Sequence, residues 1–471
     1  MWTRCRAGLA SHPKTAGGSG TLRGDVPDRA ERLPRRLGLA SAIFVLVGST
    51  IGSGIFRTPA VVAERAGTPA AFLGAWAAGG LVALAGALCL AELGAALPHT
   101  GGIYAYLRRI YGRRVAFAFG WAELVVLRPA AYGAIAVTTA EYGLRALGAA
   151  DAPSGLGIPT SQWVAAGLLV AMGAVGRRGI HRAAAVQDVT TVIKIAALVI
   201  LAAVAITAGG SGPTAPSPSS SPVAGVAGIG AAMAAVFWSY DGWSDVGFVG
   251  GEIRRPARNL PLAFLIGTAV VVGVYGLVNV GYLRVLSLDA VAHSPLVAAD
   301  AAGAVFGAPA ERWVAALVAV STLGCLNGSL MTGPRVFYAM AADGLLPRAL
   351  ARVHPKHASP AAAIDLSVGL GALFVLARTF AQLADQFVLV IWPFYALCVV
   401  GVLRLRRCAP DLPRPYRVRA APLWVLVFCA AAIAMVASYA VASPWTVAAN
   451  AGLVAAAIPV YRWIQRRGRA A

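Results

Sequence analysis

The sequence predicts an all-α integral membrane protein with about twelve transmembrane helices, on three observations. Hydrophobic residues make up 58% of the 471 residues and charged residues only 13%, about half the charged share of a typical soluble protein. Apolar stretches of about 20 residues, long enough to cross a bilayer, recur from residue 37 almost to the end. Basic residues gather in alternate connections between these stretches. Most of the surface is therefore expected to face lipid.

Each expected span is bounded by a polar, glycine-rich or proline-rich connection. The spans cover residues 37–62, 69–97, 115–147, 161–176, 186–208, 223–251, 261–283, 312–334, 359–379, 383–405, 420–441 and 445–464. Residues 1–36 are polar and rich in glycine, proline and arginine. They predict a disordered basic cytoplasmic tail rather than a cleavable signal peptide.

The net charge of +21 follows the expected topology. Most arginine and lysine residues lie in the two tails and in every second connection, and the opposite side has only Arg65, Arg145, Arg284, Arg312 and Arg378. Cytoplasmic segments of membrane proteins carry an excess of basic residues. We therefore expect a multi-pass protein of the cytoplasmic membrane with both termini in the cytoplasm. Because topology accounts for the charge, we expect no nucleic-acid partner.

The first expected span is interrupted in its middle. Its centre reads Gly48-Ser49-Thr50-Ile51-Gly52-Ser53-Gly54-Ile55-Phe56, and each glycine weakens a helix by about 1 kcal/mol relative to alanine. Unwound backbone survives in lipid only where it is buried in protein or lines a cavity. Glycine clusters also occur where two spans pack closely, so this break alone leaves a packing role open.

A second break lies in the sixth expected span. It reads Trp238-Ser239-Tyr240-Asp241-Gly242-Trp243-Ser244-Asp245 and adds carboxylates at membrane depth. If the chain contains two repeats of five spans, both breaks fall on the first helix of a repeat. Paired interrupted spans at corresponding positions indicate the binding site of an inverted-repeat transporter. The second break therefore favours a binding site over simple packing.

The chemistry of the two breaks suits an α-amino acid. A half-helix that starts near Ser53 presents free N–H groups and the positive end of its dipole, which attract a carboxylate. Freed carbonyl groups between Ser239 and Gly242 offer acceptors to an ammonium group. Gly52 and Gly54 would let a ligand reach the backbone without a side chain in the way.

Further motifs accompany the two breaks along the chain. They are Ala91-Glu92-Leu93-Gly94, Gly101-Gly102-Ile103-Tyr104-Ala105-Tyr106, Trp121 with Glu123, Arg128 and Pro129, Glu252 with Arg258-Asn259-Leu260-Pro261, Asn327-Gly328-Ser329 with Arg335, Leu346-Pro347, and His354-Pro355. Together with Gly52–Phe56 and Tyr240–Trp243, they resemble the amino acid–polyamine–organocation superfamily, and within it the L-type amino acid transporter branch. The resemblance runs from about residue 37 to 420.

The resemblance implies a leucine-transporter-like fold of five plus five inverted helices, with spans one and six broken. The expected organisation is a first repeat over 37–208, an external Pro/Ser-rich loop over 209–222, a second repeat over 223–406, two peripheral helices over 407–464 and a cytoplasmic tail over 465–471. A bundle of spans 1, 2, 6 and 7 would rock against a scaffold of spans 3, 4, 8 and 9.

The resemblance also assigns roles to residues at the breaks. Ser53, Gly54 and Ile55 would hold the substrate carboxylate, and span-six carbonyls near Trp238 to Tyr240 would take the amino group. Trp238 would be the aromatic gate over the substrate. The substrate-binding residues expected in this way are Ile51, Gly52, Ser53, Gly54, Ile55, Trp238, Ser239, Tyr240, Asp241 and Gly242.

Lys194 lies inside the fifth expected span, where a charge is costly. A lysine that extends to the interface is the simple alternative, but Lys194 is several positions from the nearer end of its span. The resemblance implies that it stands where related carriers hold sodium and that it bridges spans one and eight, so that transport needs no sodium. Cys325 occupies a position near it where relatives often have serine.

Two other charged residues have structural alternatives. Asp241 either caps the restarting half of span six or contacts a cationic substrate side chain. Arg128 in span three is interpreted as a structural residue that pairs within the helix bundle.

The sequence as a whole predicts a secondary transporter that carries amino acids, with neutral L-amino acids favoured, by sodium-independent exchange or facilitation. The alternatives are a proton-coupled permease with Lys194 as the coupling group and a transport-dead amino-acid sensor. We expect no enzyme, because no nucleophile motif accompanies the histidines. We also expect no ATP-driven pump, because no Walker-type loop is present. We expect no cofactor and no metal site. The resemblance implies that eukaryotic members often pair with a glycoprotein through a cysteine in the connection after span three. Here that connection, over 148–160, has no cysteine, so we expect no disulfide-linked heavy subunit. The expected partners are the substrate and the lipid bilayer.

Overall fold

The computed structural model describes residues 33–149, 151–153, 157–207, 226–294, 296–377 and 380–470. Across these ranges the chain is helical, and its extended pairings are two isolated bridges, Leu37 with Ile253 and Pro153 with Pro159. The expected tail over 1–36 lies outside the described residues except for its last four positions. The expected external loop over 209–222 lies outside them entirely.

The first part of the chain forms one broken and four continuous long segments. The helices are α2 (Leu39–Thr50), α3 (Gly54–Ala66), α4 (Pro69–Ala96), α5 (Ile103–Tyr111), α6 (Arg113–Ala122), the π-helix η2 (Glu123–Leu127), α7 (Arg128–Ala146), α8 (Thr160–Arg177) and α9 (Ile180–Thr207). Local chemistry sets several boundaries. Gly67, with φ of 68°, ends α3 in the left-handed conformation. The Thr68 side chain then accepts a hydrogen bond from the Ala71 N–H and begins α4.

The second part repeats this alternation of long and short helices. It contains α10 (Val226–Tyr240), α11 (Asp245–Phe248), η3 (Gly250–Glu252), α12 (Pro256–Val285), α13 (Leu288–His293), α14 (Val297–Phe306), α15 (Ala308–Thr332), α16 (Pro334–Ala342), η4 (Arg348–Ala351), α17 (Ala361–Ala377), α18 (Phe380–Cys408), α19 (Ala421–Ala442), α20 (Pro444–Ala455) and α21 (Ala457–Ala470).

Within the described residues, eight helical segments are long and apolar enough to cross a membrane. The pair α2 and α3, bent by 41°, makes a ninth. The segments α8, α10 with α11, and α17 occupy the remaining expected spans. The prediction of an all-α membrane protein with about twelve spanning segments is confirmed, and the protein is a multi-pass membrane protein.

Both expected breaks are present, and both are shorter than their sequence motifs. The first covers Ile51 to Ser53, because α2 continues to Thr50 and α3 begins at Gly54. The second covers residues 241–244, because α10 continues through Tyr240. The expectation of unwound backbone from Trp238 onward is thus corrected, because residues 238–240 are helical. The chain leaves the helix at Asp241, just before Gly242, which has a φ of 104°.

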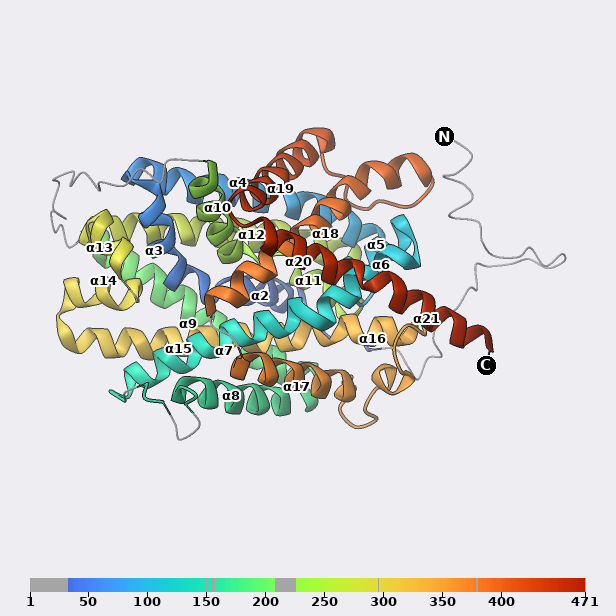
Figure 1. Ribbon diagram of the computed structural model, residues 1–471, viewed down its shortest axis with the longest axis horizontal. Helices are drawn as coiled ribbons and strands as arrows, with labels where there is room; N and C mark the ends of the chain where they lie inside the picture. Colours follow the sequence, from blue (N-terminus) through green and yellow to red (C-terminus); the bar gives the residue numbers. More distant parts are fainter. Residues whose placement is uncertain are drawn as a thin grey trace.

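The long helices form two packed groups. A first group, here called the bundle group, contains α2, α3, α4, α10 and α12, which contact one another. A second, the scaffold group, contains α7, α8, α15 and α17. Figure 1 shows α8 and α17 side by side at the lower edge of the molecule. Helix α9 packs against α12 and α2 on one side and against α15 on the other, so it links the two groups.

The short connecting helices lie at opposite ends of the long axis. Figure 1 shows α13 and α14 at one end and α5 with α16 at the other. Helix α13 packs on α3, and α14 packs on α15. The end with α5 and α16 carries Arg108, Arg109 and Arg348, whereas α3 leads from the first break toward the opposite end. The two half-helices of the broken span therefore point to different ends of the molecule.

Candidate substrate-binding site

A small cavity of about 40 Å³ lies between the two breaks. A single water needs about 10–15 Å³ by this measure, so the cavity holds a few waters or a small solute. The residues that line it are Ser49, Thr50, Gly52, Ser53, Gly54, Arg128, Ala131, Ile135, Trp238, Asp241, Gly242, Asp245, Cys325, Ser329 and Phe387. They come from both broken spans, from α7 and α15 of the scaffold group, and from α18.

The start of α3 is open to this cavity. Ser53 is its N-cap residue, but no side chain caps the helix, and no acidic residue lies in its first turn. Ser53 and Gly54 are buried and line the cavity. The first N–H groups of a helix have no partner within the helix, and they carry the positive end of the dipole. The site therefore presents donors to an anionic group, as a carboxylate requires.

The glycines of the first break serve the approach of other helices. A Cβ on Gly54 would lie 2.5 Å from the Ser239 Cα, and a Cβ on Gly52 would lie 2.5 Å from the Cys325 Sγ. The Ser239 hydroxyl also forms a short contact with the Thr58 hydroxyl. Both glycines also line the cavity, so the expectation that they let a ligand approach the backbone stays a prediction.

The second break packs on the first. A Cβ on Gly242 would lie 2.8 Å from the backbone nitrogen of Thr50. The Tyr275 hydroxyl of α12 lies 2.9 Å from the carbonyl oxygens of both Thr50 and Ser239. This hydroxyl has one proton, so it donates to one carbonyl at a time. Tyr275 thereby connects the last turns of α2 and α10, where helix ends leave carbonyl groups without partners.

Lys194 satisfies two more carbonyls of the first break. Its ammonium nitrogen lies 2.9 Å from the Gly48 oxygen and 2.7 Å from the Ile51 oxygen, and the residue is 1% exposed. It therefore joins α9 to the end of α2. Cys325 on α15 lies beside it, and its thiol is 3.0 Å from the Ser49 oxygen. Lys194 thus binds the end of span one, and the neighbouring cysteine joins span eight to the same segment.

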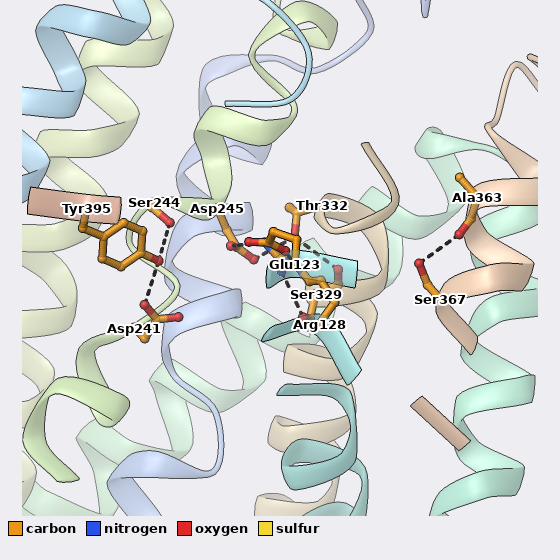
Figure 2. Close-up of polar contacts among 10 residues, drawn as sticks. All are labelled: Glu123, Arg128, Asp241, Ser244, Asp245, Ser329, Thr332, Ala363, Ser367 and Tyr395. Carbon is orange, nitrogen blue, oxygen red and sulfur yellow. Dashed lines mark hydrogen bonds and ion pairs between the residues drawn. The ribbon is translucent and has the colours of Figure 1, made fainter. Parts of the chain in front are cut away.

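Asp241 is held by the tenth span. Its carboxylate accepts a hydrogen bond of 2.8 Å from the Tyr395 hydroxyl, which also lies 2.9 Å from the Ser244 hydroxyl (Figure 2). The half-helix α11 begins at Asp245 with Ser244 as N-cap, and no side chain caps it. The capping interpretation of Asp241 is therefore corrected, and its carboxylate lines the cavity.

Arg128 forms the centre of a second polar group (Figure 2). Its guanidinium lies 2.6 Å from the Glu123 carboxylate and 3.4 Å from the Asp245 carboxylate, and it is 4% exposed. Asp245 also accepts a hydrogen bond of 2.7 Å from Thr332. The interpretation of Arg128 as a residue that pairs within the helix bundle agrees with these contacts. Because Asp245 belongs to α11 and Thr332 to α15, the network joins the second broken span to the scaffold group.

Trp238 covers the cavity together with an aromatic residue of α18. The rings of Trp238 and Phe387 pack edge to face, with centroids 5.3 Å apart. Both line the cavity, and Trp238 is 8% exposed. Trp238 belongs to α10, which packs on α3, the half-helix that leads toward the end with α13 and α14.

The comparison with known proteins agrees with this architecture. A family model described as amino acid permease matches residues 37–460, which is most of the chain. The chain belongs to the amino acid permease family. The resemblance inferred from the motifs is thereby confirmed.

Three relatives illustrate the range of similar permeases. The chain is 32% identical to the human b(0,+)-type amino acid transporter 1 over 392 residues, which cover 82% of this chain and 79% of that protein. It is 29% identical to the serine/threonine exchanger SteT of Bacillus subtilis over 441 residues, 92% and 98% of the two chains. It is 31% identical to the human large neutral amino acids transporter small subunit 2 over 405 residues, 84% and 75% of the two chains.

The permease brings most of the sequence-predicted site residues to the cavity. Those that line it are Gly52, Ser53, Gly54, Trp238, Asp241, Gly242 and Cys325. Ile51, Ile55, Ser239, Tyr240 and Lys194 lie outside its wall. The Tyr240 hydroxyl, for example, lies 3.1 Å from the Trp76 carbonyl oxygen of α4. Four of these residues belong to the two broken spans, and the fifth, Lys194, contacts the first break.

Sequence reasoning missed several residues of the wall. Ala131, Ile135, Ser329 and Phe387 line the cavity from helices far away in the sequence. The motif Asn327-Gly328-Ser329 was a signal for Ser329. An apolar residue such as Ile135 or Phe387 has no feature in the sequence that separates it from residues that face lipid.

Proposed function

We propose that the protein is a secondary transporter that exchanges neutral L-amino acids of small size across the membrane without sodium. The observation that carries this proposal is the cavity between the two breaks, which the uncapped start of α3 faces. Donors for a carboxylate and the carbonyl-rich end of α10 meet there within one small space. Membership of the amino acid permease family supports amino acids as the substrate class.

The proposed pose uses both broken spans. The substrate carboxylate binds the first N–H groups of α3, near Ser53 and Gly54, because the helix dipole favours negative charge there. The ammonium group lies toward the end of α10, where Trp238 lines the cavity and its carbonyl, which accepts one bond from the Asp241 N–H, keeps a second lone pair. Ile51, Ile55, Ser239 and Tyr240 contribute backbone or support rather than a side-chain contact.

Small neutral substrates are favoured by the size and lining of the cavity. Its small volume of about 40 Å³ favours a short side chain over a long one. Ala131, Ile135 and Phe387 form an apolar part of the wall. Asp241 is already bonded to Tyr395, which favours a neutral substrate over a cationic one. The relative named a serine/threonine exchanger has small substrates by its name.

Sodium independence rests on Lys194. Its ammonium occupies the space between the Gly48 and Ile51 carbonyls. In sodium-coupled carriers of similar fold, the resemblance implies a cation at this place. A covalently attached positive charge removes the need for one.

The proposed motion is alternating access between the bundle group and the scaffold group. The two five-helix repeats expected over 37–208 and 223–406 would supply the symmetry of this motion. Trp238 would act as the gate toward the external side. We further propose a location in the cytoplasmic membrane with both termini in the cytoplasm, since basic residues gather at the end with α5 and α16. The chain would work without a disulfide-linked heavy subunit.

Counterflow into proteoliposomes tests the function. Vesicles loaded with unlabelled amino acid should accumulate the same labelled amino acid, and a panel should rank alanine, serine and threonine above arginine and tryptophan. An inward proton gradient at zero membrane potential separates the alternatives. Stimulation that disappears in Lys194→Ala would favour a proton-coupled permease, for which the buried ammonium of Lys194 is the supporting observation. Binding without any flux would favour a sensor.

A further inference from the structure

Two connections that border the scaffold helices α8 and α17 meet at one corner of the molecule. The first joins α8 to α9 through Gly179, and the second, residues 352–360, joins η4 to α17. The Ser359 hydroxyl donates a hydrogen bond of 2.8 Å to the Arg177 carbonyl oxygen. A Cβ on Gly179 would lie 2.6 Å from the His357 carbonyl oxygen, so the two backbones are in direct contact. Residues far apart in the sequence therefore form one continuous surface.

This surface, here called the basic corner, has an excess of positive charge. Its exposed or half-buried side chains include Arg178, Arg182, His354, Lys356 and His357. Arg177 beside them pairs with Asp365, but among the described residues no carboxylate pairs with Arg178, Arg182 or Lys356. Desolvation lowers the pKa of His357, and the neighbouring basic side chains lower it further. The basic corner therefore favours an anionic ligand.

The starts of two helices add to this positive charge. Helix α9 begins at Ile180 and α17 begins at Ala361, and neither has an acidic residue in its first turn. The first N–H groups of a helix have no partner within the helix, and they carry the positive end of its dipole. The end of α8 has the opposite sign, and there the Ser359 hydroxyl binds one carbonyl. Basic side chains beside two helix starts suit a phosphate group.

An exposed apolar stripe continues from the basic corner along α9. Its members are Val189, Val192, Ile193, Val199 and Ile200, and Val189 and Ile200 are 60% and 61% exposed. Val189 follows Arg182 by two turns, so the two side chains share one helix face. The stripe from Val189 to Ile200 is about 16 Å long, close to half of the hydrocarbon core of about 30 Å. It therefore matches the acyl chains of one leaflet.

We propose that the basic corner binds the phosphate of an anionic phospholipid whose acyl chains lie along the stripe of α9. Arg178, Arg182 and Lys356 donate hydrogen bonds to the phosphodiester oxygens, since basic clusters at the membrane end of a helix attract anionic headgroups. Free phosphate has the same oxygen chemistry, but it gains nothing from an apolar stripe. The stripe therefore decides for a lipid. This inference requires a membrane protein and does not depend on which substrate is carried.

Native mass spectrometry of the full-length protein in detergent tests the proposal. The protein is titrated separately with phosphatidylglycerol and phosphatidylcholine, and the populations of lipid-bound protein give each Kd. The wild type should bind phosphatidylglycerol at least about tenfold more tightly than phosphatidylcholine. Each basic residue near a headgroup contributes about fivefold. The combined variant Arg178→Gln, Arg182→Gln and Lys356→Gln should therefore lose this preference.

A matched variant separates the basic corner from the total charge. Arg109→Gln combined with Arg114→Gln and Arg258→Gln also removes three exposed basic residues, and it should keep the preference. Because all six side chains are exposed, both triple variants should fold as the wild type does. An equal loss of preference in the two variants would overturn the proposal.

Two competitors distinguish a lipid from a free anion. Glycerophosphoglycerol, which is the headgroup without acyl chains, and inorganic phosphate should each fail to displace phosphatidylglycerol when added in large molar excess. Displacement by either competitor would assign the basic corner to a free anion and would overturn the lipid assignment.

Discussion

The ammonium nitrogen of Lys194 lies 2.7 Å from the carbonyl oxygen of Ile51, at the point where the first membrane span breaks. The same nitrogen lies 2.9 Å from the Gly48 oxygen. A helix end leaves its last carbonyls without partners, and lipid offers none. The lysine of α9 thus makes the unwound segment of span one possible, and with it the open start of α3.

The first prediction removes this ammonium. Lys194→Met keeps an apolar stem but leaves two buried carbonyls without a donor, at a cost of about 1–3 kcal/mol each. Turnover should fall at least about tenfold, whereas substrate affinity should weaken less. Thr191→Val is a matched control, because it removes a neutral contact of 3.3 Å to the Phe44 carbonyl from the same helix face. The measurement is initial exchange rate in proteoliposomes. Unchanged turnover in Lys194→Met would contradict the role given to this residue.

The second prediction concerns the close approach of α3 and α10. Gly54→Ala adds a Cβ 2.5 Å from the Ser239 Cα, which pushes the two half-helices apart at an overpacking cost of about 1–3 kcal/mol. Substrate affinity should fall about tenfold or more, although the protein still inserts. Gly74→Ala, where nothing lies within 4 Å, should bind as the wild type does. Scintillation proximity binding in detergent gives both affinities, and equal values would show that Gly54 is not a contact position.

The third prediction concerns the hydroxyl that joins the two breaks. Tyr275→Phe removes the contacts of 2.9 Å to the Thr50 and Ser239 carbonyls. One net hydrogen bond is worth about 1 kcal/mol, so turnover should fall about fivefold while the thermal stability changes little. Tyr282→Phe removes a longer contact of 3.5 Å to Ile55 and should have a smaller effect. A larger loss in Tyr282→Phe would argue against a coupling role for Tyr275.

The fourth prediction tests the aromatic cover. Trp238→Ala removes the edge-to-face contact with Phe387, worth about 0.5–1.5 kcal/mol beyond its area, and we expect it to open the cavity. Flux should fall more than binding, because an open cover prevents occlusion. Phe387→Ala should reproduce the pattern in a weaker form. Equal losses of flux and binding would assign Trp238 to substrate contact alone.

The fifth prediction concerns stability. Arg128→Met leaves the Glu123 and Asp245 carboxylates buried without their cation, and breaking a buried pair costs about 3–5 kcal/mol. The unfolding temperature in detergent should fall clearly. Adding Asp245→Asn to this variant removes one of the two orphaned charges and should recover part of the loss. A second substitution that lowers stability further would show that Arg128 and Asp245 do not act as a pair.

The spans and their breaks could be predicted from the sequence because they depend on local composition. Glycines at 48, 52 and 54 and a carboxylate at Asp241 are visible without knowledge of any neighbour. The number of unwound residues at each break could not be predicted from the sequence as well. Trp238 to Tyr240 are helical because apolar packing against other helices stabilises the last turn of α10, and such packing is not a local property.

The contacts across the site depended on tertiary structure. Tyr275 and Phe387 lie more than 100 residues from the first break, and neither has a sequence feature that marks a site residue. The purpose of Gly54 also required coordinates, since a glycine that admits a ligand and one that admits Ser239 look alike in sequence. The hydrogen bond between Asp241 and Tyr395 also required coordinates, because sequence reasoning did not connect the tenth span with this carboxylate.

The measurement that tests the account most directly is counterflow of labelled alanine in sodium and in choline buffer. Wild-type proteoliposomes loaded with unlabelled alanine should accumulate label at the same rate in both buffers, because the ammonium of Lys194 already lies against the Gly48 and Ile51 carbonyls. Lys194→Met should be slow in both. A wild-type protein that requires sodium, or one that shows no acceleration by internal amino acid, would contradict the account.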